Sequence, residues 1–319
     1  MERLTSDELR DCWPILSQPE RVEAFQHMGR ADSDDFFLEL SAADQAVLLL
    51  AMEEGERRLW VRLLAPDDAA DVVQLVSPTE RSAVLGLLDE TTRLEVTALL
   101  AYAEDAAGGL MSPRFARVRP EMSVNEAIRY LQRQAKEHLE TIYYAYVLDP
   151  EQRLEGVVSF RDLFAAAGEK PLSEVMHTDV VSVRDSMDQE SVAQVMAEHD
   201  LNAIPVVDEL GHMKGIVTVD DIVDVVQREA TEDIQKLGGM ESLDTPYLQT
   251  PMLEMVRKRA GWLSALFLGE LLTASAMSRF EDEIAKAVVL ALFVPLIISS
   301  GGNSGSQATT LIIRAMALG

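Results

Sequence analysis

The sequence predicts a multidomain protein with an all-α helical N domain, a tandem pair of α/β units, a long connecting helix and α-helical membrane segments. Three observations lead to this prediction. Apolar residues recur every three or four positions over roughly the first hundred residues, a β-rich pattern then occurs twice, and long apolar runs end the sequence. The 319 residues are enough for two or three domains with hydrophobic cores.

Charge narrows the classes of function. The net charge is −26, and all but four of the 54 acidic residues and all but three of the 28 basic residues precede Gly261. Such a surface repels nucleic acid and attracts cations, so no nucleic-acid partner is expected. The single cysteine, Cys12, excludes an internal disulfide framework and fits a reducing compartment. The charged start, Met1–Asp11, has no apolar segment typical of a cleaved signal peptide.

Residues 1–107 are predicted to be helical. Apolar residues recur at helical spacing, as in Leu94-Glu-Val-Thr-Ala-Leu-Leu100. Thr5–Glu8 and Ser77–Glu80 are capping-box patterns, the second with proline at the first helical position. Short helices at regular spacing favour a stacked helical array, and an ordinary helical bundle is the alternative.

The α/β part is predicted from an internal repeat. A helical stretch, Val124–Gln134, is followed by β-rich runs at 142–148 and 156–160. A second copy follows in the same order: 180–183, helix 189–199, 203–207 and 215–219. Met111 corresponds to Met176, and Gly156-Val-Val-Ser-Phe-Arg-Asp162 corresponds to Gly215-Ile-Val-Thr-Val-Asp-Asp221. The sequence therefore predicts two copies of one β-α-β-β-α unit, called here the first repeat (residues 108–170) and the second repeat (residues 171–228).

The duplicated Gly-hydrophobic-hydrophobic-Ser/Thr-x-x-Asp signature resembles a tandem of CBS (cystathionine-β-synthase-type) domains, which are regulatory modules that pack as pairs. The resemblance implies a regulatory adenine nucleotide such as ATP. Its phosphate would meet Ser159 or Thr218, and its ribose would meet Asp162 or Asp221. An acidic cleft opposes such a polyanion unless magnesium accompanies it.

A long helix, Asp220–Gly239, is predicted to lead out of the second repeat, and a linker with Pro246 and Pro251 follows. The first apolar run, Trp262–Met277, is short and contains Glu270, so it fits a membrane span and an interfacial helix equally well. The basic triplet Arg257–Arg259 before it favours a span that enters from the cytosolic side. Glu270 is either a functional group facing a bundle interior or a structural partner within it.

The second apolar run, residues 287–313, follows a polar hinge at 278–286 and is long enough to span a membrane. It contains Pro295 and the glycine-rich stretch Ser299–Gln307, for which non-helical backbone is expected next to protein or a water-filled cavity. No Gly-Lys-Ser/Thr follows, which excludes a phosphate-binding loop. A pore wall is favoured over close packing of small residues. The predicted pore-lining residues are Gly301, Gly302, Asn303 and Gly305.

Residues 301–315, Gly-Gly-Asn-Ser-Gly-Ser-Gln-Ala-Thr-Thr-Leu-Ile-Ile-Arg-Ala, resemble the second membrane helix of MgtE-type magnesium transporters. Glu140–Tyr144, Asp105–Met111 and Ala230–Lys236 resemble that family as well. The resemblance implies a homodimer in the inner membrane, with five membrane helices of which this sequence holds two. The implied divisions are an N domain at 1–107, the CBS domains at 108–170 and 171–228, a "plug" helix with its linker at 229–256, and an incomplete membrane domain at 257–319.

Acidic residues cluster in Asp67-Asp-Ala-Ala-Asp71 and in Asp220-Asp-Ile-Val-Asp224 and the acids after it. Like charges four apart repel on one helix face, so a solvated face is the plain interpretation and a cation site the functional one. Magnesium takes oxygen ligands, and the dispersed histidines do not suit zinc. The resemblance implies magnesium sites at Asp67, Asp71, Asp208, Asp220, Glu241 and Asp244. Leu210 stands where the family often has an acid, which leaves one ligand uncertain.

The predicted function is a magnesium-gated magnesium transporter or channel whose cytosolic part binds Mg²⁺ and holds the pore shut. When magnesium falls, repulsion among the acidic surfaces opens the assembly. The alternative is a membrane-tethered CBS module that senses Mg²⁺ or an adenine nucleotide and conducts nothing. An enzyme is not expected, because no catalytic triad, Cys-His pair or phosphate loop is present.

Overall fold

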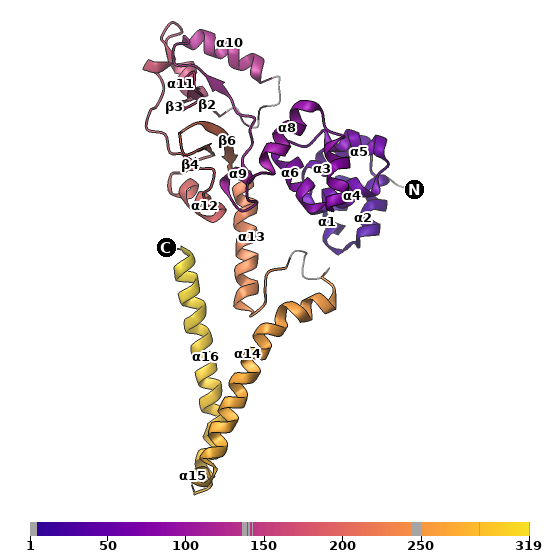
Figure 1. The fold of residues 1–319 in the computed structure, drawn as a ribbon, viewed down its shortest axis with the longest axis vertical. Helices are drawn as coiled ribbons and strands as arrows, with labels where there is room; N and C mark the ends of the chain where they lie inside the picture. The colour runs from indigo at the N-terminus through magenta and orange to yellow at the C-terminus, as the bar shows by residue number, and fades with distance from the viewer. Residues whose placement is uncertain are drawn as a thin grey trace. The chain divides into compact units, whose positions relative to one another are not determined.

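The computed structural model describes residues 5–135, 139, 141, 143–243, 250–286 and 288–318. The chain forms two compact units, Met1–Gln227 and Arg228–Gly319, and Figure 1 labels their helices and strands. The predicted fold class is confirmed: a helical N domain is followed by a pair of small mixed sheets and by long helices.

The N domain is an array of short helices with a period of 24 residues. Helices α2, α4, α6 and α8 start at 18, 42, 66 and 90, and α3, α5 and α7 start at 30, 54 and 78. The bounds are α1 (Ser6–Cys12), the 3-10 turn η1 (Trp13–Ile15), α2 (Gln18–Gln26), α3 (Arg30–Leu38), α4 (Ala42–Ala51), α5 (Glu54–Val61), α6 (Pro66–Leu75), α7 (Pro78–Leu85) and α8 (Glu90–Leu99). The predicted stacked array is therefore present, since each helix pair repeats the previous one.

Two arginines one period apart show how the array holds its turns. Arg57 donates from Nε to the Leu49 carbonyl (2.7 Å), at the end of α4. Arg81 donates from Nη2 to the Gln74 carbonyl (2.7 Å), at the end of α6. The last carbonyls of a helix have no partner within the helix, so each arginine satisfies groups that a short helix leaves unpaired.

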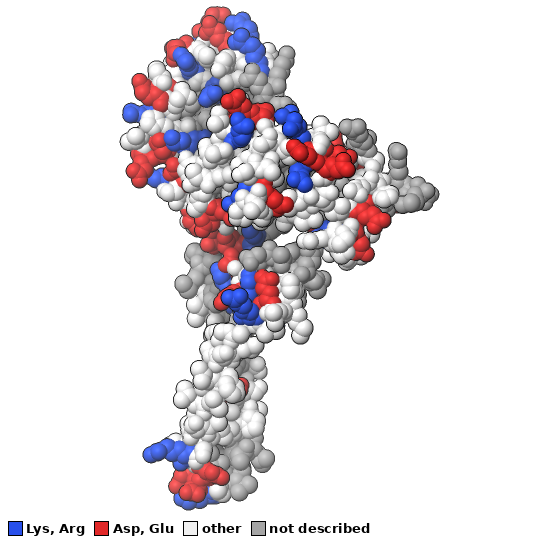
Figure 2. Space-filling model, turned by 45° about the vertical axis from the view of Figure 1, so that its right-hand side comes forward, with Lys and Arg blue, Asp and Glu red and all other residues white. Residues whose placement is uncertain are grey.

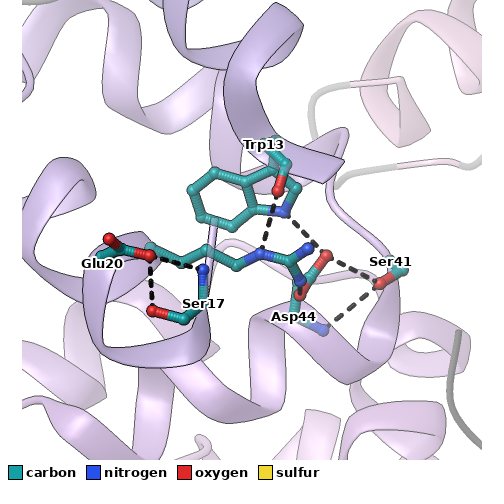
Figure 3. Close-up of polar contacts among 6 residues, drawn as sticks. Trp13, Ser17, Glu20, Ser41 and Asp44 are labelled. Atoms are coloured by element: carbon teal, nitrogen blue, oxygen red, sulfur yellow. Dashed lines mark hydrogen bonds and ion pairs between the residues drawn. The ribbon is translucent and has the colours of Figure 1, made fainter. Parts of the chain in front are cut away.

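A buried ion pair joins the first helices (Figure 3). The Arg21 guanidinium on α2 is 6% exposed and pairs with Asp44 on α4. The Trp13 indole donates to the other Asp44 oxygen (2.8 Å), and Arg21 Nε donates to the Trp13 carbonyl (3.1 Å). A buried charge is costly unless it is paired and hydrogen-bonded, and here both conditions hold. Asp44 is therefore a structural acid.

The two repeats have the same topology. In each sheet a short first strand pairs parallel with the second strand, which pairs antiparallel with the third. The first repeat contains α9 (Ala107–Leu110), β1 (Arg117–Val118), α10 (Val124–Gln134), β2 (Tyr144–Leu148), β3 (Leu154–Ser159) and α11 (Phe160–Ala165). The second contains η2 (Leu172–Glu174), β4 (Val183–Arg184), α12 (Gln189–Glu198), β5 (Ala203–Val207), β6 (Met213–Thr218) and the start of α13 (Val219–Leu237). The tandem prediction is thus correct, although β4 is shorter than the predicted run at 180–183 and Ile142 lies outside the described residues.

The repeats exchange the segments that precede them. Ser112 and Ile216 of β6 donate to each other's carbonyls (2.8 and 2.9 Å), and His177 and Val157 of β3 do the same (2.9 Å each). The signature glycines permit this approach. A Cβ at position 215 would lie 2.6 Å from the Ser112 carbonyl oxygen, and one at position 156 would lie 2.8 Å from the Met176 sulfur. The duplicated Gly is therefore a packing requirement of the pair.

The second unit contains α14 (Met252–Arg279), α15 (Glu281–Lys286) and α16 (Val288–Leu318). Among the described residues, α14 alone is long and apolar enough to cross a membrane, so the run that the sequence left undecided is the one that qualifies. The lower part of this unit is largely uncharged in Figure 2, and charged residues gather at its lower tip, where α15 lies in Figure 1. The polar hinge predicted at 278–286 is mostly helical: α14 extends to Arg279, and Glu281–Lys286 forms α15.

The expectation of non-helical backbone in the glycine-rich stretch is wrong. Ser299–Gln307 lies inside α16, a helix of 31 residues that also contains Pro295. A helix satisfies its own N–H and C=O groups, which an apolar segment requires, and glycine costs only about 1 kcal/mol per residue there. The carbonyls of this stretch are therefore helix acceptors, and its side-chain amides are those of Asn303 and Gln307. The pore-facing role predicted for Asn303 stays a prediction.

Candidate cation-sensing and nucleotide-binding residues

The N-domain acids lie on α6. Asp67 is in the first turn and 7% exposed, and Asp71 is one turn later and half-buried. The helix starts at Pro66, so the positive end of its dipole favours a carboxylate at 67. The 24-residue period places Ala43 and Thr91 at the positions equivalent to Asp67. The array itself therefore does not require an acid there.

Asp208 lies in the turn between β5 and β6 and is surrounded by donors. Its Oδ2 is 2.9 Å from His212 Nδ1 and 3.1 Å from Lys214 Nζ. Its Oδ1 accepts from the backbone N–H groups of Leu210 and His212 (2.9 Å each). Burial raises the pKa of Asp208, but these hydrogen bonds together lower it by more than burial raises it. The pKa therefore lies well below the usual range for aspartate. The carboxylate is ionised and held in place, and a magnesium ion would have to share it with Lys214.

Asp220 is exposed in the first turn of α13. Its neighbour Asp221 accepts from the Thr218 hydroxyl (2.7 Å) and from the Thr218 N–H (3.3 Å). Asp220 is therefore open to solvent on the second repeat, whereas Asp221 serves the start of its helix.

The first repeat has the same helix start. Asp162 accepts from the Ser159 hydroxyl (2.6 Å), and the Ser159 Oγ accepts from the Asp162 N–H (3.1 Å). Hydrogen bonding by Ser159 lowers the pKa of Asp162 despite partial burial, and His177 Nε2 lies 3.3 Å from its Oδ2. The four predicted nucleotide residues thus form two equivalent helix-capping pairs. Nucleotide binding at these residues remains a prediction.

The second unit contains two groups of predicted residues, the magnesium residues after α13 and the pore-lining residues on α16. Glu241 is exposed after α13, and its N–H donates to the Lys258 carbonyl (3.3 Å). Asp244 lies outside the described residues. Asn303 is exposed on α16, and a Cβ at Gly301, Gly302 or Gly305 would meet nothing within 4 Å. Within the described residues, no other segment packs against these three glycines, and the choice between a pore wall and close helix packing stays a prediction.

The described residues bring no three His, Cys, Asp or Glu side chains close enough to hold a metal ion. The available donors are carboxylate oxygens, which fit magnesium chemically, yet a complete ligand set is not assembled by them. The contacts of His212 and Lys214 with Asp208, called here the clamp on Asp208, were not predicted from the sequence. The i,i+4 spacing of Asp208 and His212 was a signal, but only the hairpin register brings Lys214 to the same oxygen.

Two protein families match the chain. The family described as the MgtE intracellular N domain matches residues 4–105, and the CBS domain family matches residues 107–169 and 172–228. The magnesium transporter MgtE of Thermus thermophilus is 47% identical over 223 residues, which cover 70% of this chain and 49% of the relative. The MgtE of Bacillus subtilis is 35% identical over 301 residues, which cover 94% of this chain and 66% of the relative.

A solved structure supports the same assignment. The crystal structure of the cytosolic domain of the Mg²⁺ channel MgtE in complex with ATP is 41% identical, with a TM-score of 0.64. The similarity covers 70% of this chain and 90% of that one. The chain spans about half the length of the Thermus relative. These relatives are transporters and not enzymes.

Proposed function

The chain belongs to the MgtE family, and on this premise we propose that it forms the magnesium-sensing part of a magnesium-gated magnesium channel or transporter. The N domain and the CBS pair lie in the cytosol, the C-terminal helices lie in the inner membrane, and the protein works as a homodimer. The observation that carries the proposal is the similarity to the Bacillus transporter over 94% of this chain, because a match of that extent includes sensing and membrane segments together.

The distribution of charge supports magnesium as the sensed ion. All but four of the acids precede Gly261, and basic residues are outnumbered there about two to one. At high cytosolic Mg²⁺, ions bind the carboxylates at Asp67 and Asp71, at Asp208 and Asp220, and at Glu241 and Asp244, and reduce their mutual repulsion. Each ion favours the closed state only by its higher affinity for that state.

Limited proteolysis tests magnesium sensing. In millimolar Mg²⁺, cleavage in the segment 244–249 should slow several-fold, because closure protects the chain on either side of it. An Asp67→Asn/Asp71→Asn variant should need several-fold more Mg²⁺ for the same protection. Asp34→Asn/Asp35→Asn changes the N-domain charge equally at exposed acids and should behave as wild type. Cleavage that does not respond to Mg²⁺ would rule out sensing by this chain.

Ion flux tests conduction separately. Liposomes that contain this chain should be compared with liposomes that contain a version extended to five membrane helices. Flux only in the extended version would assign this chain to sensing and gating. Flux in neither version, with protease protection intact, would favour the non-conducting regulatory module.

ATP is a second candidate ligand, because the related cytosolic domain was solved with ATP and the two capping pairs offer a hydroxyl and a carboxylate at equivalent places. Calorimetry with ATP and Mg²⁺ should show binding that Asp162→Asn weakens, since the amide cannot accept from ribose as strongly as the carboxylate. A flat titration of the wild-type chain would remove this candidate. Retained magnesium protection in that case would leave the main proposal standing.

A further inference from the structure

A pocket of about 280 Å³ opens at one end of the first repeat's sheet. Its polar lining comes from Arg117 and Arg119 at β1, Tyr130 on α10 and Gln152 in the β2–β3 turn. Both arginines are exposed, whereas Val118 between them is 2% exposed and belongs to the core. The strand is therefore anchored by its apolar residue while two guanidinium groups remain at the pocket.

These arginines are exceptional in so acidic a chain. No carboxylate of a described residue forms an ion pair with either guanidinium. Between residues 113 and 134, five arginines accompany two glutamates, although the whole chain carries a net charge of −26. Arg114, at the start of this stretch, is already paired with Glu95 (2.9 Å). Local positive charge is thus concentrated where the pocket opens.

The second repeat shows that the fold does not require this charge. The strand registers make Val118 equivalent to Val183, because each pairs with the matching valine of the second strand. Arg119 then corresponds to Arg184, but Arg117 corresponds to Ser182.

The neighbouring helices differ in the same direction. Their N-caps, Ser123 and Asp188, are equivalent, so Tyr130 corresponds to Val195 and Arg133 to Glu198. In the first repeat Arg133 lies over the Tyr130 ring, with 5.8 Å between the guanidinium carbon and the ring centroid. The same topology therefore folds in the second repeat without counterparts of Arg117, Tyr130 and Arg133.

Gln152 adds a polar side chain at a position that usually excludes one. Its φ is 68°, and Gly211, the equivalent residue of the second repeat, has φ 84°. Residues other than glycine are disfavoured in this left-handed region. The first repeat nevertheless has a glutamine there, and this residue lines the pocket.

We propose that this pocket binds the phosphate group of a small anion. Guanidinium groups are planar forks that bind phosphate oxygens through paired, charge-assisted hydrogen bonds. The Tyr130 hydroxyl and the Gln152 amide supply further donors. The volume is close to the lower end of the roughly 300–1,000 Å³ typical of small-molecule pockets, which suits free phosphate, pyrophosphate or a single lipid headgroup phosphate.

This site differs from the predicted nucleotide residues. In the sheet, Tyr144 pairs with Ser159 at one end, and Leu148 pairs with Leu154 at the other. The pocket includes Leu148, whereas Ser159 and Asp162 lie at the opposite end. Four residues of strand separate the two ends by about 14 Å. The pocket contains none of the predicted magnesium residues, so phosphate binding there does not depend on magnesium sensing.

Calorimetry tests the site with the full chain in phosphatidylcholine nanodiscs and magnesium-free buffer. Inorganic phosphate and pyrophosphate should bind saturably, and Arg117→Gln/Arg119→Gln should weaken binding roughly tenfold or more. Arg58→Gln/Arg129→Gln removes two exposed arginines outside the pocket and should change the affinity less than twofold. Arg117→Lys/Arg119→Lys should have an intermediate affinity, because lysine keeps the positive charge but cannot form the paired hydrogen bonds of a guanidinium group.

A second arm identifies the source of the phosphate. If the chain in phosphatidylglycerol nanodiscs binds phosphate and pyrophosphate with unchanged affinity, the site takes a soluble anion. If it binds them several-fold more weakly, the lipid headgroup competes for the pocket and is its ligand. No saturable binding of either anion to wild-type protein would overturn the proposal. Equal losses in the two glutamine variants, with unchanged unfolding temperatures, would also overturn it, because they would reduce the effect to general charge.

Discussion

The two repeats have one topology and different chemistry, and the difference separates what the fold requires from what it leaves free. Both have a capping pair at the end of the third strand, a signature glycine and an exchanged preceding segment. They differ at the hairpin turn and at the first strand. Positions kept in both repeats meet a requirement of the shared fold, so a function specific to one repeat should be sought at the differing positions.

The hairpin turns show this most clearly. Asp149 of the first repeat accepts from the Arg153 N–H (2.7 Å), and this is a common turn contact. Its counterpart Asp208 has in addition His212 and Lys214 at its other oxygen. The second repeat thus holds a fixed anion at the turn, and the first repeat holds a basic pocket beside the same turn.

The largest expected effect concerns the signature glycines. Gly215→Ala should lower the free energy of unfolding by about 2–3 kcal/mol, because the new Cβ meets the backbone carbonyl of Ser112. Gly156→Ala should cost about 1–2 kcal/mol, since its first contact is the movable Met176 side chain. Denaturant unfolding of the two variants measures the gap. Equal losses of stability would show that the segments packed against Gly215 and Gly156 are equally rigid.

Next in size is the difference between the hairpin acids. Asp208→Asn should destabilise by about 1–2 kcal/mol at pH 7, because charge-assisted hydrogen bonds are lost. Asp149→Asn should cost a few tenths of a kcal/mol, because only a backbone donor is affected.

The pH dependence provides the control for that comparison. The folded pKa of Asp208 lies below its unfolded value of about 4, so its contribution is complete above pH 4 and is lost as the pH falls through the folded pKa. The gap between wild type and Asp208→Asn should therefore shrink from pH 7 to pH 3. A gap that is constant with pH would show that ionisation of Asp208 does not matter.

The capping pairs should respond alike. Ser159→Ala and Thr218→Ala each remove the hydroxyl at a helix start and should each cost about 1 kcal/mol. Thermal unfolding of both variants is the measurement. A cost several-fold larger in one repeat would contradict the view that these positions are structurally equivalent.

The smallest effect is expected at the left-handed turn position. Gln152→Gly should stabilise by a few tenths of a kcal/mol, because relief of the left-handed conformation outweighs the extra freedom of the unfolded chain. Gly211→Gln should destabilise by about 1 kcal/mol. Denaturant midpoints measured side by side test both signs, and a loss of stability in Gln152→Gly would mean that the glutamine side chain contributes to folding.

Much of the fold could be predicted from the sequence because its signals are local or duplicated. Helix starts such as Thr5–Glu8 and the duplicated glycine signature indicate the elements and their order, and the motif at 301–315 indicates the family, which is confirmed. The exact 24-residue period was not predicted, since the repeated positions share spacing more than residue identity. The helical conformation of Ser299–Gln307 was missed because glycine favours many conformations, and the helical flanks decide among them.

The sites were less accessible to sequence reasoning because they depend on tertiary contacts. The patterns around Asp67 and Asp208 indicated acidity but not the burial of the first or the clamp on the second. Arg117 and Arg119 were not singled out, because two arginines around a valine have no special pattern. Their significance arises from the pocket and from the comparison with Ser182 and Arg184.

Direct magnesium binding tests the central claim, that the acidic surfaces sense the ion. Calorimetry of the chain with Mg²⁺ should show saturable binding in the millimolar range or tighter, and Asp67→Asn/Asp71→Asn should weaken it several-fold. Asp34→Asn/Asp35→Asn should match wild type, because it removes the same charge from exposed positions. Equal weakening by the two variants, or binding that neither changes, would contradict the account.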